Sequence, residues 1–182
     1  MRRLRKVARV YFYARSDELK FGDIREVLPV GHYFTHISWN YFPKWVEENK
    51  PIIPDYQRGY VWIEQQQIDY CEAILKGCPS GRDIYFNHPD WMGGYDGDLE
   101  ILDGQQRIGA VTAFLNNKIK VFGNYFNEYK DKIRSHICFG VHILKFQTRK
   151  EKLEFYLAFN NGGTIHTKDE LDKVRNLLLE AL

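Results

Sequence analysis

The chain has 182 residues, of which 26 are Lys or Arg and 24 are Asp or Glu, so its formal net charge is +2. Hydrophobic residues make up 44% of the chain and aromatic residues 15%, which is enough apolar material for one folded domain and excludes a disordered protein. A charge this close to zero also argues against a protein that coats nucleic acid through its overall charge.

The sequence contains no signal for a membrane or for an oxidising compartment. No apolar run approaches the roughly 18 residues of a membrane span, and the basic residues 1–9 are not followed by the apolar core of a signal peptide. The cysteines Cys71, Cys78 and Cys138 form no C-x-x-C pair, so we expect reduced thiols and neither a disulfide framework nor a cysteine zinc site. These features predict a cytoplasmic protein without membrane contact.

The first 50 residues are predicted to be an N-terminal extension. Residues 1–9 carry five basic and no acidic side chains, which favours a solvated tail over an arm that binds nucleic acid. Residues 10–50 are rich in aromatic side chains but show no steady helical or strand period. We therefore place a boundary after residue 50, with an aromatic-rich extension at 1–50 and the main domain at 51–182.

The main domain is predicted to mix short strands with helices. Apolar spacing and turn residues predict strands at 83–86, 99–102, 118–122 and 137–146. Helical spacing predicts helices at 63–76, 108–115 and 150–159, and from a capping box at Thr167 and Glu170 to the C-terminus. The strands at 83–86 and 99–102 are expected to pair as a hairpin. The expected class is α+β, a mixed sheet with flanking helices.

The most informative segment is a predicted strand that ends in Asp103-Gly104 and a helix that starts with Gln105-Gln106-Arg107. The first N–H groups of a helix have no partner within it, so they attract an anion. Gly104 lets the backbone approach a ligand closely, and Arg107 can make a bidentate contact with a phosphate. In the alternative interpretation Asp103 caps the helix, Gly104 is a turn residue and Arg107 forms a surface ion pair.

A second polar cluster, Gln57-Arg58, lies within an aromatic stretch that follows two prolines. Aromatic packing could fix Arg58 so that it converges with Arg107 on one phosphate, as in the clamps of nucleotide enzymes. The alternative is a structural ion pair of Arg58 with Asp55 or Asp103. Both interpretations stay open from the residues alone.

Metal sites are less strongly indicated. Asp96, Asp98 and Glu100 could supply oxygen ligands to Mg²⁺, but a hairpin turn that begins at Asp96 is the favoured interpretation. The pair His32 and His36 lies beside a glycine in an aromatic stretch, where a helical zinc site is not expected. No Gly-x-x-x-x-Gly-Lys-Ser/Thr loop is present, so a nucleotide site would not be of the Walker type.

The two polar segments together resemble the N-terminal domain of GmrSD-type restriction proteins, a member of the ParB/sulfiredoxin-like superfamily. The matching motifs are Ile53-Pro54-Asp55-Tyr56-Gln57-Arg58-Gly59-Tyr60-Val61-Trp62 and Asp103-Gly104-Gln105-Gln106-Arg107. The resemblance covers about residues 50–175 and includes an asparagine-glycine segment at 159–164. Where the family usually continues with Leu-Thr-Thr-Leu, this chain has Ile108-Gly109-Ala110-Val111.

The resemblance implies a ParB/sulfiredoxin-like fold and a phosphate site for a nucleoside triphosphate (NTP) or DNA. The phosphate-binding residues that it implies are Gln57, Arg58, Gly104, Arg107 and Asn160. The catalytic residues that it implies are Asp103, Gln105, Gln106 and Arg107. In a hydrolase, Gln105 or Gln106 would position water, and Asp103 would orient that water or hold Mg²⁺ as a metal ligand.

From this resemblance we expect Mg²⁺-dependent NTP hydrolysis in a restriction or phage–host conflict, with DNA nicking as the alternative activity. The chain ends at Leu182 without the helical region and nuclease domain of the full restriction proteins. We therefore expect a stand-alone copy of the domain, as in a phage or mobile element. A hypothesis from another class is a non-catalytic binding or decoy module that contacts a host protein through its N-terminal extension.

Overall fold

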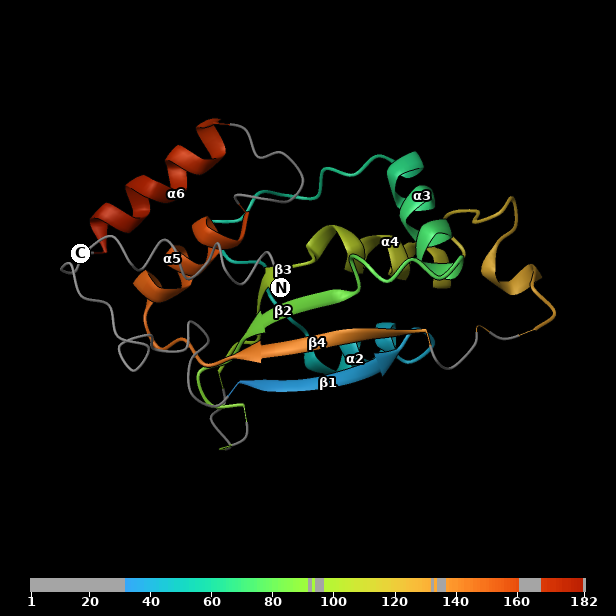
Figure 1. The fold of residues 1–182 in the computed structure, drawn as a ribbon, viewed down its shortest axis with the longest axis horizontal. Helices are drawn as coiled ribbons and strands as arrows, with labels where there is room; N and C mark the ends of the chain where they lie inside the picture. Colours follow the sequence, from blue (N-terminus) through green and yellow to red (C-terminus); the bar gives the residue numbers. More distant parts are fainter. Residues whose placement is uncertain are drawn as a thin grey trace, which may run out of the picture.

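The computed structural model describes residues 32–91, 93, 97–131, 133, 137–160 and 168–181. Its centre is a sheet with the strand order β1-β4-β2-β3 (Figure 1). The strands are β1 (Tyr33–Ser38), β2 (Asp83–Asn87), β3 (Glu100–Asp103) and β4 (Cys138–Leu144). β4 runs antiparallel to β1 and parallel to β2, and β2 pairs antiparallel with β3. The mixed sheet and its helices confirm the predicted α+β class, while the assignment to the ParB/sulfiredoxin-like superfamily stays a prediction.

Four of the helices form two pairs that lie toward opposite ends of the sheet (Figure 1). The helices in the described residues are α2 (Phe42–Asn49), α3 (Glu64–Leu75), α4 (Gln105–Leu115), α5 (Arg149–Asn160) and α6 (Lys168–Glu180), with a short 3₁₀ turn, η3 (Phe126–Glu128). α3 packs on α4 and α5 packs on α6, and the two pairs lie toward opposite ends of the molecule (Figure 1). The predicted helices are confirmed, although Thr167 of the proposed capping box lies outside the described residues. None of the helices in the described part of the chain combines the length and apolar composition that crossing a bilayer requires.

The core follows from the period-two alternation of β2 and β4, because successive side chains of a strand point to opposite faces. Ile84 and Phe86 of β2 and Val141 of β4 are fully buried in the main core with Phe114 of α4. The opposite face carries Leu144 of β4, which is buried in a smaller cluster that also includes a phenylalanine from α5. The hairpin predicted from 83–86 and 99–102 is confirmed by the antiparallel pairing of β2 with β3.

The strand predicted at 118–122 is wrong. The segment makes a single bridge, between Val121 and Asn124, and Asn117 and Phe122 have positive φ angles of 56° and 50°. Ile119 and Val121 are nevertheless buried in the core. The alternation that suggested a strand therefore reflects a turn in which every second side chain is buried. Among the described residues this turn pairs with no strand.

The described part of the predicted N-terminal extension belongs to the same core as the rest of the chain. β1 pairs with β4 along its whole length, and Trp39 and Phe42 are fully buried in the main core. The structure thus contains β1 and α2 as integral elements of the domain. The division after residue 50 otherwise stays a prediction, since residues 1–31 lie outside the described part.

Candidate phosphate-binding site

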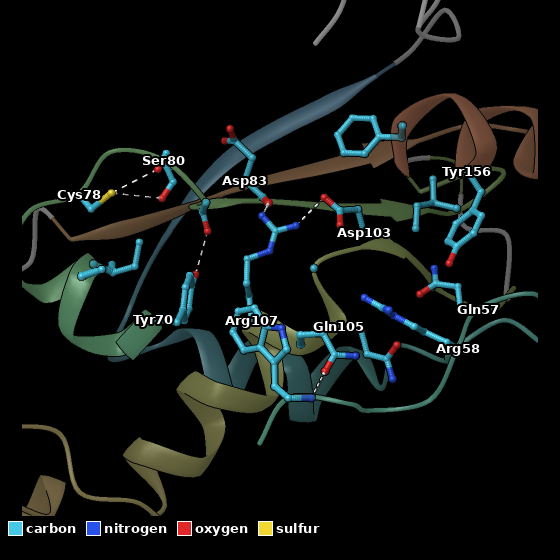
Figure 2. Close-up of a pocket in the computed structure, with 18 residues that line it drawn as sticks. Gln57, Arg58, Tyr70, Cys78, Ser80, Asp83, Asp103, Gln105, Arg107 and Tyr156 are labelled. Atoms are coloured by element: carbon cyan, nitrogen blue, oxygen red, sulfur yellow. Dashed lines mark hydrogen bonds and ion pairs between the residues drawn. The ribbon is translucent and has the colours of Figure 1, made fainter. Parts of the chain in front are cut away.

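A cavity of about 690 Å³ lies where β3 ends and α4 begins (Figure 2). Its walls come from α3, the connection between α3 and β2, the β3–α4 turn, α5 and the loop before α3. The predicted site residues that line it are Gln57, Arg58, Asp103, Gly104, Gln105, Gln106 and Arg107. The structure therefore brings both motifs to one cavity. Asn160 is the last residue of α5, and its side chain lies outside the described part.

The turn at Gly104 and the first residues of α4 line this cavity. The first intrahelical hydrogen bond runs from the Ile108 N–H to the Gly104 carbonyl at 2.9 Å, so the N–H groups of 105–107 precede it. No side chain among the described residues caps this end, and Asp103 points elsewhere. Gly104 has φ +110°, and a Cβ at this position would lie 2.6 Å from Cδ1 of Ile84. Only glycine fits this turn without strain.

Arg107 is fixed at the cavity wall by two oxygen atoms. Its Nη2 lies 2.5 Å from Oδ2 of Asp103, and its Nη1 donates to the backbone carbonyl of Asp83 at 2.7 Å (Figure 2). Only 13% of the Arg107 side chain and 21% of the Asp103 side chain are exposed. Burial alone would lower the pKa of Arg107, but the Asp103 carboxylate, together with Tyr70 and Asp83, holds that pKa above its ordinary value. The pair is thus a largely buried one and not the surface ion pair of the alternative interpretation.

Arg58 extends into the cavity from the loop before α3 (Figure 2). Its Nη1 lies 3.5 Å from Oε2 of Glu170 on α6, and 15% of the Arg58 side chain is exposed. The carboxylate of Asp55 pairs instead with Arg149 at 2.8 Å. The ion pair of Arg58 therefore ties the loop to the C-terminal helix, a contact that the sequence did not predict.

The two glutamines that flank these arginines bind backbone. Gln57 donates from Nε2 to the carbonyl of Ile101 in β3. Gln106 bonds to three backbone groups in residues 59–62, two through its amide oxygen and one through its amide nitrogen. Gln105 is buried at the cavity wall. The roles predicted for Gln105 and Gln106 in positioning water stay predictions.

Several cavity residues could not be found from the sequence because they are distant along the chain. Tyr70 of α3 donates from its hydroxyl to the carbonyl of Gly81 at 2.8 Å. Burial raises the pKa of Tyr70, and it raises that of Tyr156 on α5 to about 12, so both phenols keep their protons near neutral pH. At the rim, hydrogen bonding with Ser80 lowers the pKa of the Cys78 thiol.

Within the described ranges, no three His, Cys, Asp or Glu side chains gather where they could hold a metal ion. The carboxylate of Glu100 accepts from Nζ of Lys152 at 2.8 Å, and Asp96 lies outside those ranges. Asp103 is the predicted metal ligand that lines the cavity, and its Oδ2 faces Arg107.

Residues 43–180 match the family model described as the GmrSD restriction endonuclease, N-terminal domain. The matched segment contains both motifs and all of the cavity-lining residues. No curated protein and no solved structure is significantly similar to the chain. The family match confirms the resemblance that the two motifs indicated.

Proposed function

The chain belongs to the family of GmrSD restriction endonuclease N-terminal domains, and from this premise we propose that it binds the phosphates of an NTP in the cavity at the start of α4. Family membership indicates a role related to restriction. The observation that supports phosphate binding is that two arginines line one cavity together with a helix start that no side chain of the described residues caps. Each of these features attracts phosphate oxygens, and all of them line the same cavity.

The helix amides and the two arginines would each contact the phosphates in a different way. The amides of 105–107 would take phosphate oxygens along the axis of α4, where the helix dipole favours negative charge. Arg107 is already held in place by Asp103 and Asp83, so little side-chain freedom is lost when it contacts a phosphate. Arg58 would supply the second guanidinium from the facing loop.

We extend the proposal to NTP hydrolysis. Mg²⁺ commonly binds through one or two carboxylates together with substrate phosphates, and it would neutralise charge on those phosphates. In this cavity Asp103 would be its protein ligand, shared with Arg107. Arg58 and Arg107 would stabilise the charge that develops as a phosphoryl group leaves.

The test is phosphate release by the purified protein with Mg²⁺ and ATP, GTP, CTP or UTP. We expect release from at least one of the four, and its loss in Arg58→Ala and Arg107→Ala. Absence of release from all four would overturn hydrolysis. Nicking of supercoiled plasmid DNA under the same conditions would favour the nuclease alternative, and triphosphate binding without either reaction would favour a non-catalytic module.

A further inference from the structure

We infer that Gln106 is a positioning residue that holds Arg58 at the cavity, a role that presupposes the phosphate site proposed above. Its side chain makes three hydrogen bonds across 44 to 47 positions of sequence. Oε1 accepts from the N–H groups of Val61 and Trp62 at 2.9 and 3.0 Å. Nε2 donates to the carbonyl of Gly59, the residue after Arg58, at 3.2 Å.

These bonds leave the Gln106 amide oxygen no capacity to orient an attacking water. An amide oxygen has two lone pairs, and both are used by the N–H groups of Val61 and Trp62. A water that attacks phosphorus must donate a proton to an acceptor, so the acceptor has to be another group. The acceptor oxygen of Gln106 therefore holds the loop and does not accept a proton from an attacking water.

A second contact locks the same loop to the same helix. Tyr60 donates from its hydroxyl to the carbonyl of Gln106 at 3.2 Å. Its ring lies against Gly109, where an added Cβ would come 2.2 Å from Cε2 of Tyr60. A side chain at 109 would push the ring away, which gives a physical reason for glycine at a position where the resemblance leads one to expect threonine.

Arg58 depends on this arrangement because it directly precedes the clamped residues 59–62. With the loop fixed on α4, the Arg58 guanidinium is presented to the cavity before a ligand arrives. Without the hydrogen bonds that hold it on α4, the loop would sample other positions. The cost of ordering the loop on binding would then reduce the affinity for phosphate. Gln106 should therefore act on binding only through Arg58.

The test is a double-mutant cycle in the affinity of the full chain for inorganic triphosphate with Mg²⁺, measured by calorimetry. We expect Arg58→Ala and Gln106→Ala each to weaken binding about tenfold, and the double variant to bind within about twofold of Arg58→Ala. Gln106→Glu keeps the acceptor for Val61 and Trp62 but turns an oxygen toward the Gly59 carbonyl, so an intermediate affinity is expected. Gln65→Ala, an exposed glutamine of α3 that does not line the cavity, should bind like the parent.

The outcomes separate the two proposals. If Arg58→Ala binds weakly while Gln106→Ala binds like the parent, the positioning role is overturned and the phosphate site stands. A double variant that is weakened by the product of the two single effects would also overturn that role, because Gln106 would then act independently of Arg58. If the parent does not bind triphosphate, or if both arginine variants bind like the parent, the proposed function and the positioning role are overturned together.

Discussion

Arg107 stabilises the fold and, in the proposed function, also binds phosphate. Its guanidinium joins the end of β3 to the start of β2, through the Asp103 carboxylate and the Asp83 carbonyl. The Asp103 side chain is only 21% exposed, and removing Arg107 would leave its carboxylate without the neighbouring cation. We predict that Arg107→Ala lowers the free energy of unfolding by about 2–3 kcal/mol, between the values for exposed and fully buried pairs. It should also lose triphosphate binding under conditions where the variant is folded, as shown by thermal denaturation and calorimetry.

Arg58→Ala is the matched comparison. The 3.5 Å pair of Arg58 with Glu170 is longer than that of Arg107, and Glu170 is 31% exposed. We expect a loss of stability below about 1 kcal/mol and a loss of triphosphate affinity of about 1–3 kcal/mol, the scale of a hydrogen bond to a charged group. A variant that melts far below the parent but binds triphosphate equally well would show that Arg58 is structural.

The face of the sheet opposite the main core carries a histidine, His142, that should make stability depend on pH. His142 of β4 donates from Nε2 to Asp83 at 3.3 Å, its Nδ1 lies 3.0 Å from Nε2 of His32, and its ring stacks on Tyr85 at 4.4 Å between centroids. Burial lowers the pKa of His142 below 6.5 although Asp83 opposes this, and burial with the His142 charge lowers that of His32.

Because the folded protein favours neutral rings, the unfolded chain binds more protons as the pH falls below about 6.5. We predict that the free energy of unfolding decreases from about pH 6.5 downward and levels off below the lowered pKa values. His142→Phe keeps a ring beside Tyr85 but cannot titrate, so its stability should change less between pH 7.5 and 5.5 in urea denaturation. An unchanged pH dependence in this variant would contradict the assignment.

At the scale of elements, the strand, turn and helix around Gly104 depend on a backbone conformation that only glycine adopts easily. We predict that Gly104→Ala lowers the free energy of unfolding by roughly 2–4 kcal/mol, because φ +110° and the overlap with Ile84 act together. Gly77→Ala is the control, since Gly77 has φ +102° but no atom within 4 Å of an added Cβ. That change should cost only about 1 kcal/mol, and equal losses in urea denaturation would exclude the overlap with Ile84.

The two motifs also form one unit at this scale. The first is tied to β3 through the side chain of Gln57 and through Ile52, which directly precedes the motif, and to α4 through Gln106. The hydrogen bonds of the second motif thus position the first, which explains why a match in both motifs was informative about one site. Neither motif forms the cavity alone, since its lining comes from both motifs and from other segments.

For the molecule as a whole, the sequence predicted those elements that a local pattern of residues determines. Periodicity and turn residues located β2, β3, β4, α3, α4, α5 and α6, and the glycine turn located the start of α4. β1 and α2 were not predicted, because residues 10–50 show no steady period. The strand order, the pairing of Arg58 with Glu170 and the contribution of Tyr70 depend on contacts between distant segments. The strand expected at 118–122 failed because burial of alternate residues is shared by strands and by packed turns.

Whether phosphate binds at the start of α4 is tested most directly by nuclear magnetic resonance of the ¹⁵N-labelled protein during titration with ATP and Mg²⁺. The proposed function predicts that the largest shifts occur at the backbone amides of 104–107 and at the side-chain Nε signals of Arg58 and Arg107. Signals from the face of the sheet that carries His142 should move little. Shifts confined to that face, or no shifts at ATP concentrations that saturate ordinary nucleotide sites, would contradict a phosphate site in this cavity.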